Sequence, residues 1–265
     1  MTIGFIGCGN MAGAIIKGIV KAQAVDAAEI FAYDKDNAKT AAFADELGIN
    51  VCNNANEIVE NSDYTVLAVK PNVLASVLDG INLKTQSKET VLISIAAGKS
   101  IDFIRSSLSH NNKIIRVMPN INALVGAACS AYCANEIVEK EDKDFVEKIF
   151  GAVGEICEIS ESFFPLFGVV AGCSPAFSYM FIDELARAAV KNGMPKDMAL
   201  RFAAQTVLGS AKLILESDEQ PYQLVDKVCS PGGTTIEGVL ALQEKGFADA
   251  VHKAVQAAFE KDKKL

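Results

Sequence analysis

The sequence predicts an α/β fold, in which a mainly parallel sheet covered by helices on both faces is followed by an all-helical part. Up to about residue 160, short apolar runs typical of strands alternate with helical stretches, as in a parallel sheet with helices on both faces. Beyond Ser160 the strand signal nearly vanishes and helical periodicity continues. We therefore expect two domains, residues 1–160 and residues 161–265.

Strands of the first domain are expected where short apolar and β-branched runs lie between turn signals. These runs are Thr2–Ile6, Ile30–Tyr33, Ile49–Cys52, Tyr64–Val69, Val91–Ile95, Ile114–Val117, Ser130–Cys133 and Glu155–Ile159. Helical stretches that separate many of them are Met11–Ala22, Asn37–Leu47, Ile101–Leu108 and Lys143–Phe150.

Start and stop signals divide the second domain into helices. Ser174 followed by Pro175 is typical of an N-cap with proline at the first helical position. Gly193 is expected to end this helix, and Pro195 to begin the next, which runs to about Glu216.

The composition excludes several classes of protein. Half of the 265 residues are hydrophobic and 22% are charged, so the chain is far too apolar to be disordered. Acidic residues outnumber basic ones by 33 to 25, for a formal net charge of −8, and without a clustered basic stripe nucleic acid is not an expected partner.

The run Phe163–Val170 is very apolar, and we expect part of it to be buried in a homodimer.

The seven cysteines are expected to be free thiols. Their number is odd, they form no Cys-x-x-Cys pair, and both histidines lie far from the closest pair, Cys129 and Cys133. Neither a disulfide framework nor a metal site is therefore predicted.

The apolar N-terminus lacks a basic segment before Lys17, and no uninterrupted apolar stretch is long enough to span a membrane. We expect a soluble, cytoplasmic protein without a membrane partner.

A glycine-rich turn follows the first strand and opens the first helix. Gly7–Ala12 matches the G-x-G-x-x-G/A fingerprint of Rossmann-type dinucleotide-binding domains in its proper context. Gly7 would allow the tight turn, Gly9 would let a pyrophosphate approach the backbone, and the helix amides would hold the phosphates. The expected cofactor-binding residues here are Ile6, Gly7, Cys8, Gly9, Asn10, Met11 and Ala12.

The end of the second strand bears on the choice between NADH and NADPH. Asp34 follows the fingerprint at the distance at which an acidic side chain accepts hydrogen bonds from the adenosine ribose, which favours NAD(H). Lys35 and Lys39 are close in sequence and could instead meet a 2′-phosphate. The sequence leaves the preference between NADPH and NADH open.

Two further segments are expected at the carboxyl ends of strands, where open α/β sheets bind their ligands. They are Ala68–Val69–Lys70–Pro71, after the fourth strand, and Ser94–Gly98, after the fifth. Small residues such as Ala97 would let a flat nicotinamide ring approach the backbone.

The helical domain carries one dense polar segment, Ser230-Pro-Gly-Gly-Thr-Thr235. Two glycines and hydroxyl residues at a helix start expose amides suited to a carboxylate. Thr235 could present its hydroxyl to a reacting atom. Thr234 and Glu237 match a capping box for a helix through Gln243, which would need no ligand.

Four motifs in a fixed order resemble one family. They are Gly4–Ala12, Ala68–Pro71, Arg116-Val-Met-Pro-Asn120 and Ser230–Thr235. Together they closely resemble pyrroline-5-carboxylate reductase, and the resemblance covers nearly the whole chain. The last motif is the specific one, because many dehydrogenases share the nucleotide fingerprint.

The resemblance implies NAD(P)H-dependent reduction of the cyclic imine 1-pyrroline-5-carboxylate to L-proline, the last step of proline synthesis. It implies a Rossmann domain followed by an all-helical dimerisation domain, giving a homodimer or a higher homo-oligomer. In the family the residue matching Thr235 lies beside the imine nitrogen, and the preceding loop cradles the carboxylate. By position the substrate-binding residues are Ser230, Gly232, Gly233 and Thr234, and Asn120 joins the cofactor-binding set.

The chain departs from the family pattern at three places. The family usually has Ser-Gly-Ser-Gly-Pro-Ala-Tyr where this chain has Ala171–Phe177. Its Met-Pro-Asn motif is usually followed by Thr-Pro, but here by Ile121–Asn122. An asparagine that contacts the cofactor aligns with Ala55, one place after Asn54.

The scarcity of histidine suits an imine substrate. Only His110 and His252 are present, both in polar stretches, and there is no tryptophan. A protonated imine already carries the charge that attracts hydride, so alignment and preorganised electrostatics can supply most of the acceleration. Thr235 is then expected to act as a catalytic hydrogen-bonding orienter, or as a proton donor through water, rather than as a base.

Two alternative functions are also compatible with the sequence. A reductase of the β-hydroxyacid dehydrogenase kind uses a lysine on the long helix, where this chain offers Arg187 and Lys191. A non-enzymatic module that senses NAD(P)H would bind cofactor without turnover, and would leave the Ser230–Thr235 segment without a purpose.

Overall fold

The computed structural model describes residues 1–263, which form two compact units. The first unit extends from Met1 to Gly172, and the second begins at Cys173. Within the described residues the last strand ends at Glu158 and only helical elements follow. The all-helical part of the chain therefore begins inside the first unit.

The first unit is built on an eight-stranded sheet. Its order is β3-β2-β1-β4-β5-β6-β7-β8, and all neighbouring pairs are parallel except β6 and β7. The predicted α/β fold with a mainly parallel sheet is confirmed. The strands are β1 (Ile3–Ile6), β2 (Ile30–Tyr33), β3 (Asn50–Val51), β4 (Tyr64–Leu67), β5 (Val91–Ser94), β6 (Ile114–Met118), β7 (Ala128–Ala134) and β8 (Gly154–Glu158).

Helices connect the strands and continue after the sheet. Those that lie before the second unit are α1 (Asn10–Lys21), α2 (Asn37–Leu47), α3 (Ala55–Asn61), α4 (Leu74–Ser87), α5 (Ile101–Ser106), α6 (Lys140–Gly151) and α7 (Phe164–Phe167). Short 3-10 turns are η1 (Ala27–Glu29), η2 (Ile121–Val125) and η3 (Glu161–Phe163), and η4 (Gly168–Cys173) is a π-helix. The second unit contains α8 (Ser174–Lys191), α9 (Lys196–Glu216), α10 (Pro221–Val228), α11 (Thr234–Glu244) and α12 (Phe247–Asp262).

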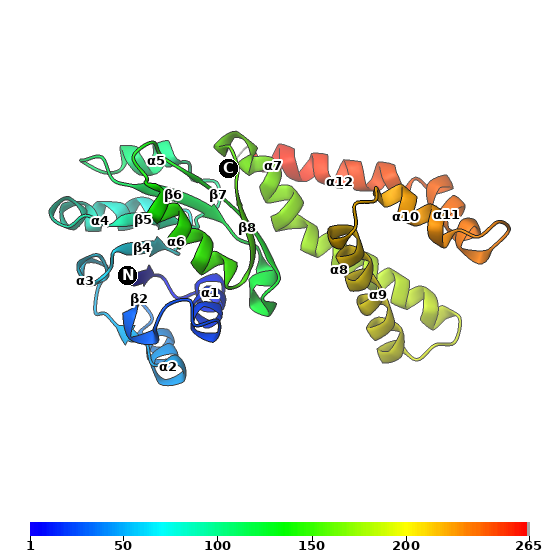
Figure 1. Cartoon of the computed structure of the whole chain (residues 1–265), viewed down its shortest axis with the longest axis horizontal. Helices are drawn as coiled ribbons and strands as arrows, with labels where there is room; N and C mark the ends of the chain where they lie inside the picture. The colour runs from blue at the N-terminus through cyan, green and yellow to red at the C-terminus, as the bar shows by residue number, and fades with distance from the viewer. Residues whose placement is uncertain (264–265) are drawn as a thin grey trace. The chain divides into compact units, whose positions relative to one another are not determined.

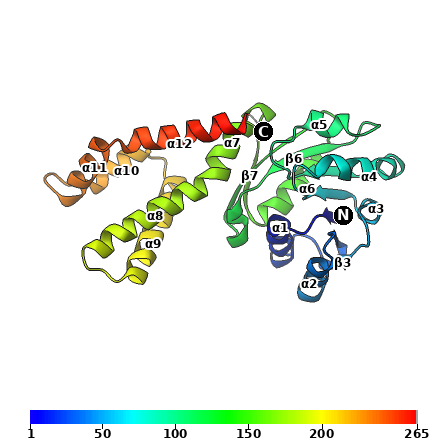
Figure 2. The ribbon, with the colours of Figure 1, turned by 180° about the vertical axis from the view of Figure 1, so that it is seen from behind.

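Alternate side chains of the central strands enter two separate cores. Phe5 and Val66 belong to the core beneath α1 and α6, whereas Ile6 and Leu67 belong to the core beneath α3, α4 and α5. This alternation is what a strand buried on both faces requires. The two views of the ribbon show helices on both faces of the sheet (Figure 1 and Figure 2).

The strand order determines where a ligand can enter. β1 lies between β2 and β4, so the order of chain connections reverses between β1 and β4. The loops after these two strands diverge to opposite faces and leave a crevice at the carboxyl edge, which is the usual ligand site of an open α/β sheet.

The second unit has a small core of its own. Ala186 on α8 packs with Ala199 and Ala203 on α9, and the ring of Phe181 on α8 lies 6.1 Å from that of Phe247 on α12. Helices α8 and α9 run side by side in both views (Figure 1 and Figure 2). Because the buried residues are mostly alanines, each contributes little burial energy.

Two predicted helix starts are wrong by one residue. Ser174 lies inside α8 and the N-cap is Cys173, because the chain enters this helix already helical from η4. Thr234 lies inside α11, whose N-cap is Gly233 without a side-chain cap, so the expected capping box does not form. The predicted helix end at Gly193 and start at Pro195 are confirmed, since Gly193 has a φ of +97° and Pro195 is the N-cap of α9.

Many large apolar side chains of the second unit are exposed in the single chain. Examples are Met180, Phe202 and Leu208. On length and composition alone, the helical stretches Glu161–Lys191 and Lys196–Glu216 could cross a membrane, although one or two such helices are weak support for a span. Exposed apolar surface of this size is also what a subunit interface requires.

Candidate active site

A cavity of about 340 Å³ lies at the carboxyl edge of the sheet. It is lined by residues 9–12 after β1, 68–70 after β4, 95–97 after β5 and 116–119 at the end of β6. The fingerprint, the Ala68–Lys70 segment and Ala97 are thus brought together. Sequence reasoning missed Arg116–Pro119 as cavity residues, although the position of their strand beside β5 at the same edge was available as a signal.

Gly7 is required by the turn after β1. Its φ is +100°, and a Cβ at this position would lie 2.6 Å from the carbonyl oxygen of Ala68. Its amide donates a hydrogen bond of 2.7 Å to the carbonyl of Tyr33. The turn thereby brings the ends of β1, β2 and β4 together, and only glycine tolerates both the backbone conformation and the close approach.

The N-terminus of α1 is suited to a pyrophosphate. Gly9 is the N-cap, no side chain of the described residues caps the helix, and no acidic residue lies in its first turn. A Cβ at Gly9 would meet no atom within 4 Å. The first amides therefore face open space with the positive end of the helix dipole behind them, the arrangement that binds phosphates. These residues fit a dinucleotide.

Asp34 binds the backbone of the glycine-rich loop. Its Oδ2 accepts a hydrogen bond of 2.7 Å from the amide of Cys8, and its Oδ1 accepts one of 2.9 Å from the amide of Asp36. Burial, with the Asp34 charge as a second cause, raises the pKa of the Cys8 thiol to about 12. The thiol stays neutral at physiological pH, so it does not repel an anionic cofactor.

Cationic side chains border the cavity. Lys70 is exposed at its edge. Arg116 is buried, at 8% exposure, and its Nη1 lies 3.0 Å from Oε1 of Glu161, while its guanidinium lies over the ring of Phe164 at 4.4 Å. Lys70 is therefore the side chain free to turn toward a bound phosphate, whereas Arg116 is held by partners of its own.

Six residues predicted to bind the cofactor do not line this cavity: Ile6, Gly7, Cys8, Asp34, Pro71 and Asn120. Asn120 is 5% exposed, and both ends of its amide have protein partners. Ile6 is buried at the end of β1. Asn54, the neighbour of Ala55, is the N-cap of α3, with its Oδ1 3.0 Å from the amide of Glu57. The assignments of all predicted site residues to cofactor or substrate stay predictions.

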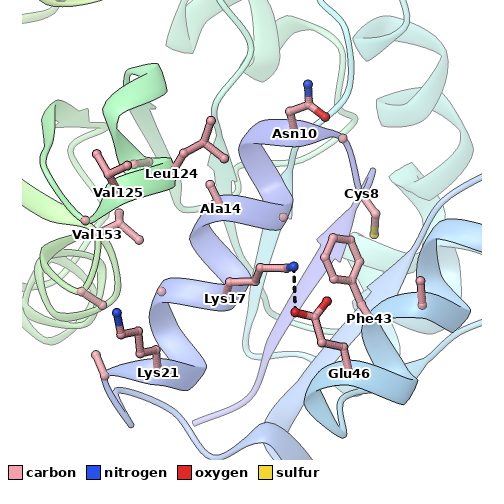
Figure 3. Close-up of a pocket in the computed structure, with 18 of the residues that line it drawn as sticks. Cys8, Asn10, Ala14, Lys17, Lys21, Phe43, Glu46, Leu124, Val125 and Val153 are labelled. Atoms are coloured by element: carbon pink, nitrogen blue, oxygen red, sulfur yellow. Dashed lines mark hydrogen bonds and ion pairs between the residues drawn. The ribbon is translucent and has the colours of Figure 1, made fainter. Parts of the chain in front are cut away.

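A second, larger cavity of about 830 Å³ extends along α1 (Figure 3). It lies between α1, the aromatic ring of Phe43 on α2, and Leu124 and Val125 on η2. Figure 3 shows Lys17 reaching Glu46 across it, a contact of 2.8 Å. Gly9 and Asn10 line both cavities, but only the smaller one lies at the ends of β4, β5 and β6.

The segment Ser230–Thr235 forms a tight turn in the second unit. The amide of Gly233 donates a hydrogen bond of 3.0 Å to the carbonyl of Ser230, and Gly232 has a φ of +67°. With Pro231 at the second position this is the arrangement of a type II turn. It leads directly into α11 without a side-chain cap, so the amides of Thr234 and Thr235 are not bound by a capping side chain of the described residues.

Other residues considered for catalysis lie elsewhere or have structural partners. Arg187 forms an i,i+4 ion pair with Asp183 on α8, and Lys191 is exposed near the end of the same helix. His252 is exposed on α12 and His110 follows α5. No group of three His, Cys, Asp or Glu side chains within residues 1–263 could hold a metal ion, and all seven cysteines are free.

The fold and the site define the class: a dinucleotide-binding oxidoreductase with an appended helical domain. Residues 161–265 match the family described as pyrroline-5-carboxylate reductase dimerisation, and residues 2–98 match the family described as NADP oxidoreductase coenzyme F420-dependent. Pyrroline-5-carboxylate reductase from Escherichia coli (strain K12) is 45% identical over 264 residues, covering 99% of this chain and 97% of the relative. The chain therefore belongs to the pyrroline-5-carboxylate reductase family.

Solved structures agree with this membership. Pyrroline carboxylate reductase from Plasmodium falciparum, with NADP bound, has a TM-score of 0.87 and 36% identity, covering 99% of this chain and 97% of its own. Pyrroline-5-carboxylate reductase from Coxiella burnetii has a TM-score of 0.93 and 31% identity with the same coverage. The alternative of a β-hydroxyacid dehydrogenase is thus not supported. The match to a dimerisation domain also indicates a homo-oligomer.

Proposed function

We propose that the protein reduces 1-pyrroline-5-carboxylate to L-proline with NAD(P)H, the final step of proline biosynthesis. The observation that carries this proposal is the cavity between the ends of β1 and β4, where the order of the chain connections reverses. The N-terminus of α1 at this cavity has no side-chain cap, and the same chain carries the Ser230–Thr235 segment. The full-length similarity to the reductase of Escherichia coli supports the choice of substrate.

The cofactor would be held by the backbone around the cavity. The amides of Gly9, Asn10 and Met11 would bind the pyrophosphate, and Lys70 would add a positive charge at the cavity edge. Val69, Pro71 and Ala97 would border the nicotinamide. When bound, the reduced nicotinamide supplies the hydride that adds to the imine carbon, while the C=N electron pair passes to nitrogen.

Residues near the end of β2 would contact the adenosine. Asp34 holds the Cys8 amide, so its carboxylate would act on the cofactor chiefly by shaping the loop. Lys35 and Lys39 are exposed beside it, where a 2′-phosphate would be attracted. The NADP in the Plasmodium relative supports a cofactor that carries the 2′-phosphate.

The turn Ser230–Gly233 and the start of α11 would hold the substrate. The side chain of Ser230 and the amides of Gly232, Gly233 and Thr234 would bind the carboxylate, which is favoured at a helix N-terminus. The hydroxyl of Thr235 would hydrogen-bond the ring nitrogen and orient the imine carbon. Because a protonated imine already attracts hydride, no histidine base is needed, in keeping with the positions of His110 and His252.

The assembly and its location follow from the same proposal. We infer a homodimer, or a larger ring built from dimers, through the apolar faces of α8 and α9. Free cysteines on the surface, such as Cys157 and Cys173, suit a reducing cytoplasm. The acidic balance supports the absence of a nucleic-acid partner, and burial of the apolar helices in the oligomer would leave no face for a membrane.

The test is turnover by the purified full chain with 1-pyrroline-5-carboxylate. Loss of reduced-cofactor absorbance is followed with NADPH and with NADH in parallel, and L-proline is identified as the product. We expect turnover with at least one cofactor and none with small hydroxy acids and oxidised cofactor. Cofactor binding without turnover would instead identify a binding module.

A further inference from the structure

A π-helix lies against the end of β6, beside the cavity. Residues Gly168–Cys173 form this element, which is rare as a sustained helix and is frequently found at functional sites. The wider winding shifts the backbone hydrogen bonds from i,i+4 to i,i+5, so neighbouring carbonyls need other partners.

Asn120 holds one of those carbonyls. Its Nδ2 donates a hydrogen bond of 2.9 Å to the carbonyl oxygen of Ala171, and its Oδ1 accepts one of 3.2 Å from the amide of Cys129. The side chain is 5% exposed. One buried amide thus joins the end of β6, the start of β7 and the π-helix. Each end of the amide therefore has a protein partner, and its near-complete burial leaves little of its surface for a cofactor.

The π-helix is in turn the support behind a cavity residue. A Cβ on Gly168 would lie 2.8 Å from Cε and 3.3 Å from the sulfur of Met118. Met118 itself lines the 340 Å³ cavity. The backbone of the π-helix therefore sets how far the Met118 side chain can withdraw from the cavity.

We propose that Asn120 is a positioning residue: it holds the π-helix through the Ala171 carbonyl, and the π-helix holds Met118 against the nicotinamide end of the cavity. This inference rests on the proposed function and replaces the predicted role of Asn120 as a direct cofactor ligand. The consequence is kinetic. Loss of the contact lets Met118 and the cavity wall shift, which misaligns the reacting atoms but leaves the phosphate contacts intact.

The first test compares Asn120→Ala with Asn120→Asp in the full-length enzyme. Asn120→Asp keeps the acceptor for Cys129 but places a carboxylate oxygen against the Ala171 carbonyl. In both variants we expect kcat to fall about tenfold or more, which corresponds to a rise of about 1.4 kcal/mol in the activation free energy, with the Kd for NADPH within about twofold of wild type. A tenfold rise in Kd with kcat unchanged would instead show a cofactor ligand and overturn the proposal.

The second test does not depend on Asn120 variants folding. Gly168→Ala puts a methyl group against Met118, and Met118→Ala removes the side chain that it meets. We expect Gly168→Ala to lower kcat, and the double variant to have a higher kcat than the product of the two single effects predicts. Strict additivity, or a wild-type kcat for Gly168→Ala, would contradict the proposal. Wild-type turnover is measured alongside, so a failure of the proposed function itself is recognised separately.

Discussion

At the scale of single residues, two glycines of the same turn meet opposite surroundings. Gly7 has a positive φ and lies against the Ala68 carbonyl, whereas a Cβ on Gly9 would meet no atom within 4 Å. The fingerprint therefore combines a glycine required by the fold with one that leaves room for a ligand. Sequence alone identifies both positions but does not separate these two requirements.

Alanine at each glycine should separate the two requirements. Gly7→Ala is expected to lower the free energy of unfolding by about 1–3 kcal/mol or more, because alanine is strained at this φ. Gly9→Ala should leave the unfolding free energy nearly unchanged and weaken NADPH binding, since its methyl group enters the space proposed for the pyrophosphate. Urea unfolding and cofactor titration of both variants check this. Equal stability of the two variants would contradict the account.

The hydroxyl of Thr235 is the proposed orienter of the imine. Thr235→Ala should lower kcat/KM for 1-pyrroline-5-carboxylate by about tenfold to a hundredfold, the usual range for one well-placed donor. Thr235→Ser keeps the hydroxyl and should recover most of the loss. Full kcat/KM in Thr235→Ala, measured by steady-state kinetics at saturating NADPH, would rule out this role.

At the scale of elements, the sequence predicts what local chemistry determines. Strands such as Ile30–Tyr33 and the helix Asn37–Leu47 agree with the structure residue for residue, because apolar runs and turn residues specify them. The π-helix at Gly168–Cys173 was not predicted, since it depends on Asn120, which is 51 positions from its partner Ala171. The same segment explains why the predicted N-cap at Ser174 is wrong. Contacts between residues far apart in the sequence determine both the π-helix and the start of α8.

The exposed apolar faces of the second unit should determine the oligomeric state. Leu208 on α9 is 62% exposed in the single chain, and Leu83 on α4 in the first unit is 79% exposed. Leu208→Glu would place an unpaired carboxylate in the interface and should shift the protein toward monomer. Leu83→Glu is the matched control and should leave the mass unchanged. Light scattering at micromolar concentration checks both, and an unchanged mass for Leu208→Glu would place the interface elsewhere.

At the scale of the whole molecule, buried thiols make the fold sensitive to alkali. Burial is the main cause that raises the pKa of both Cys8 and Cys133 from 9.0 to about 12. Between these values the unfolded chain releases protons that the folded chain retains. Stability contributed by the neutral thiols is therefore complete below about pH 9 and declines as the pH rises toward 12.

Unfolding at different pH values tests this expectation. The free energy of unfolding should fall above pH 9, with each buried thiol contributing up to about 1.4 kcal/mol per pH unit. Cys8→Ala should make the decline less steep, because it removes one of the buried thiols whose pKa is raised. The readout is the slope of the free energy of unfolding against pH, which is independent of any packing lost in the variant. Identical slopes for wild type and Cys8→Ala would contradict this explanation.

The central claim is that the protein transfers hydride from a reduced nicotinamide to the carbon of a cyclic imine. It is tested most directly by tracing the hydride: NADPH carrying deuterium at nicotinamide C4, in each of its two stereoisomers, is incubated with the wild-type protein and 1-pyrroline-5-carboxylate. The account predicts L-proline with deuterium at the former imine carbon from one stereoisomer and none from the other. Unlabelled proline from both, or no proline while NADPH binds, would contradict it.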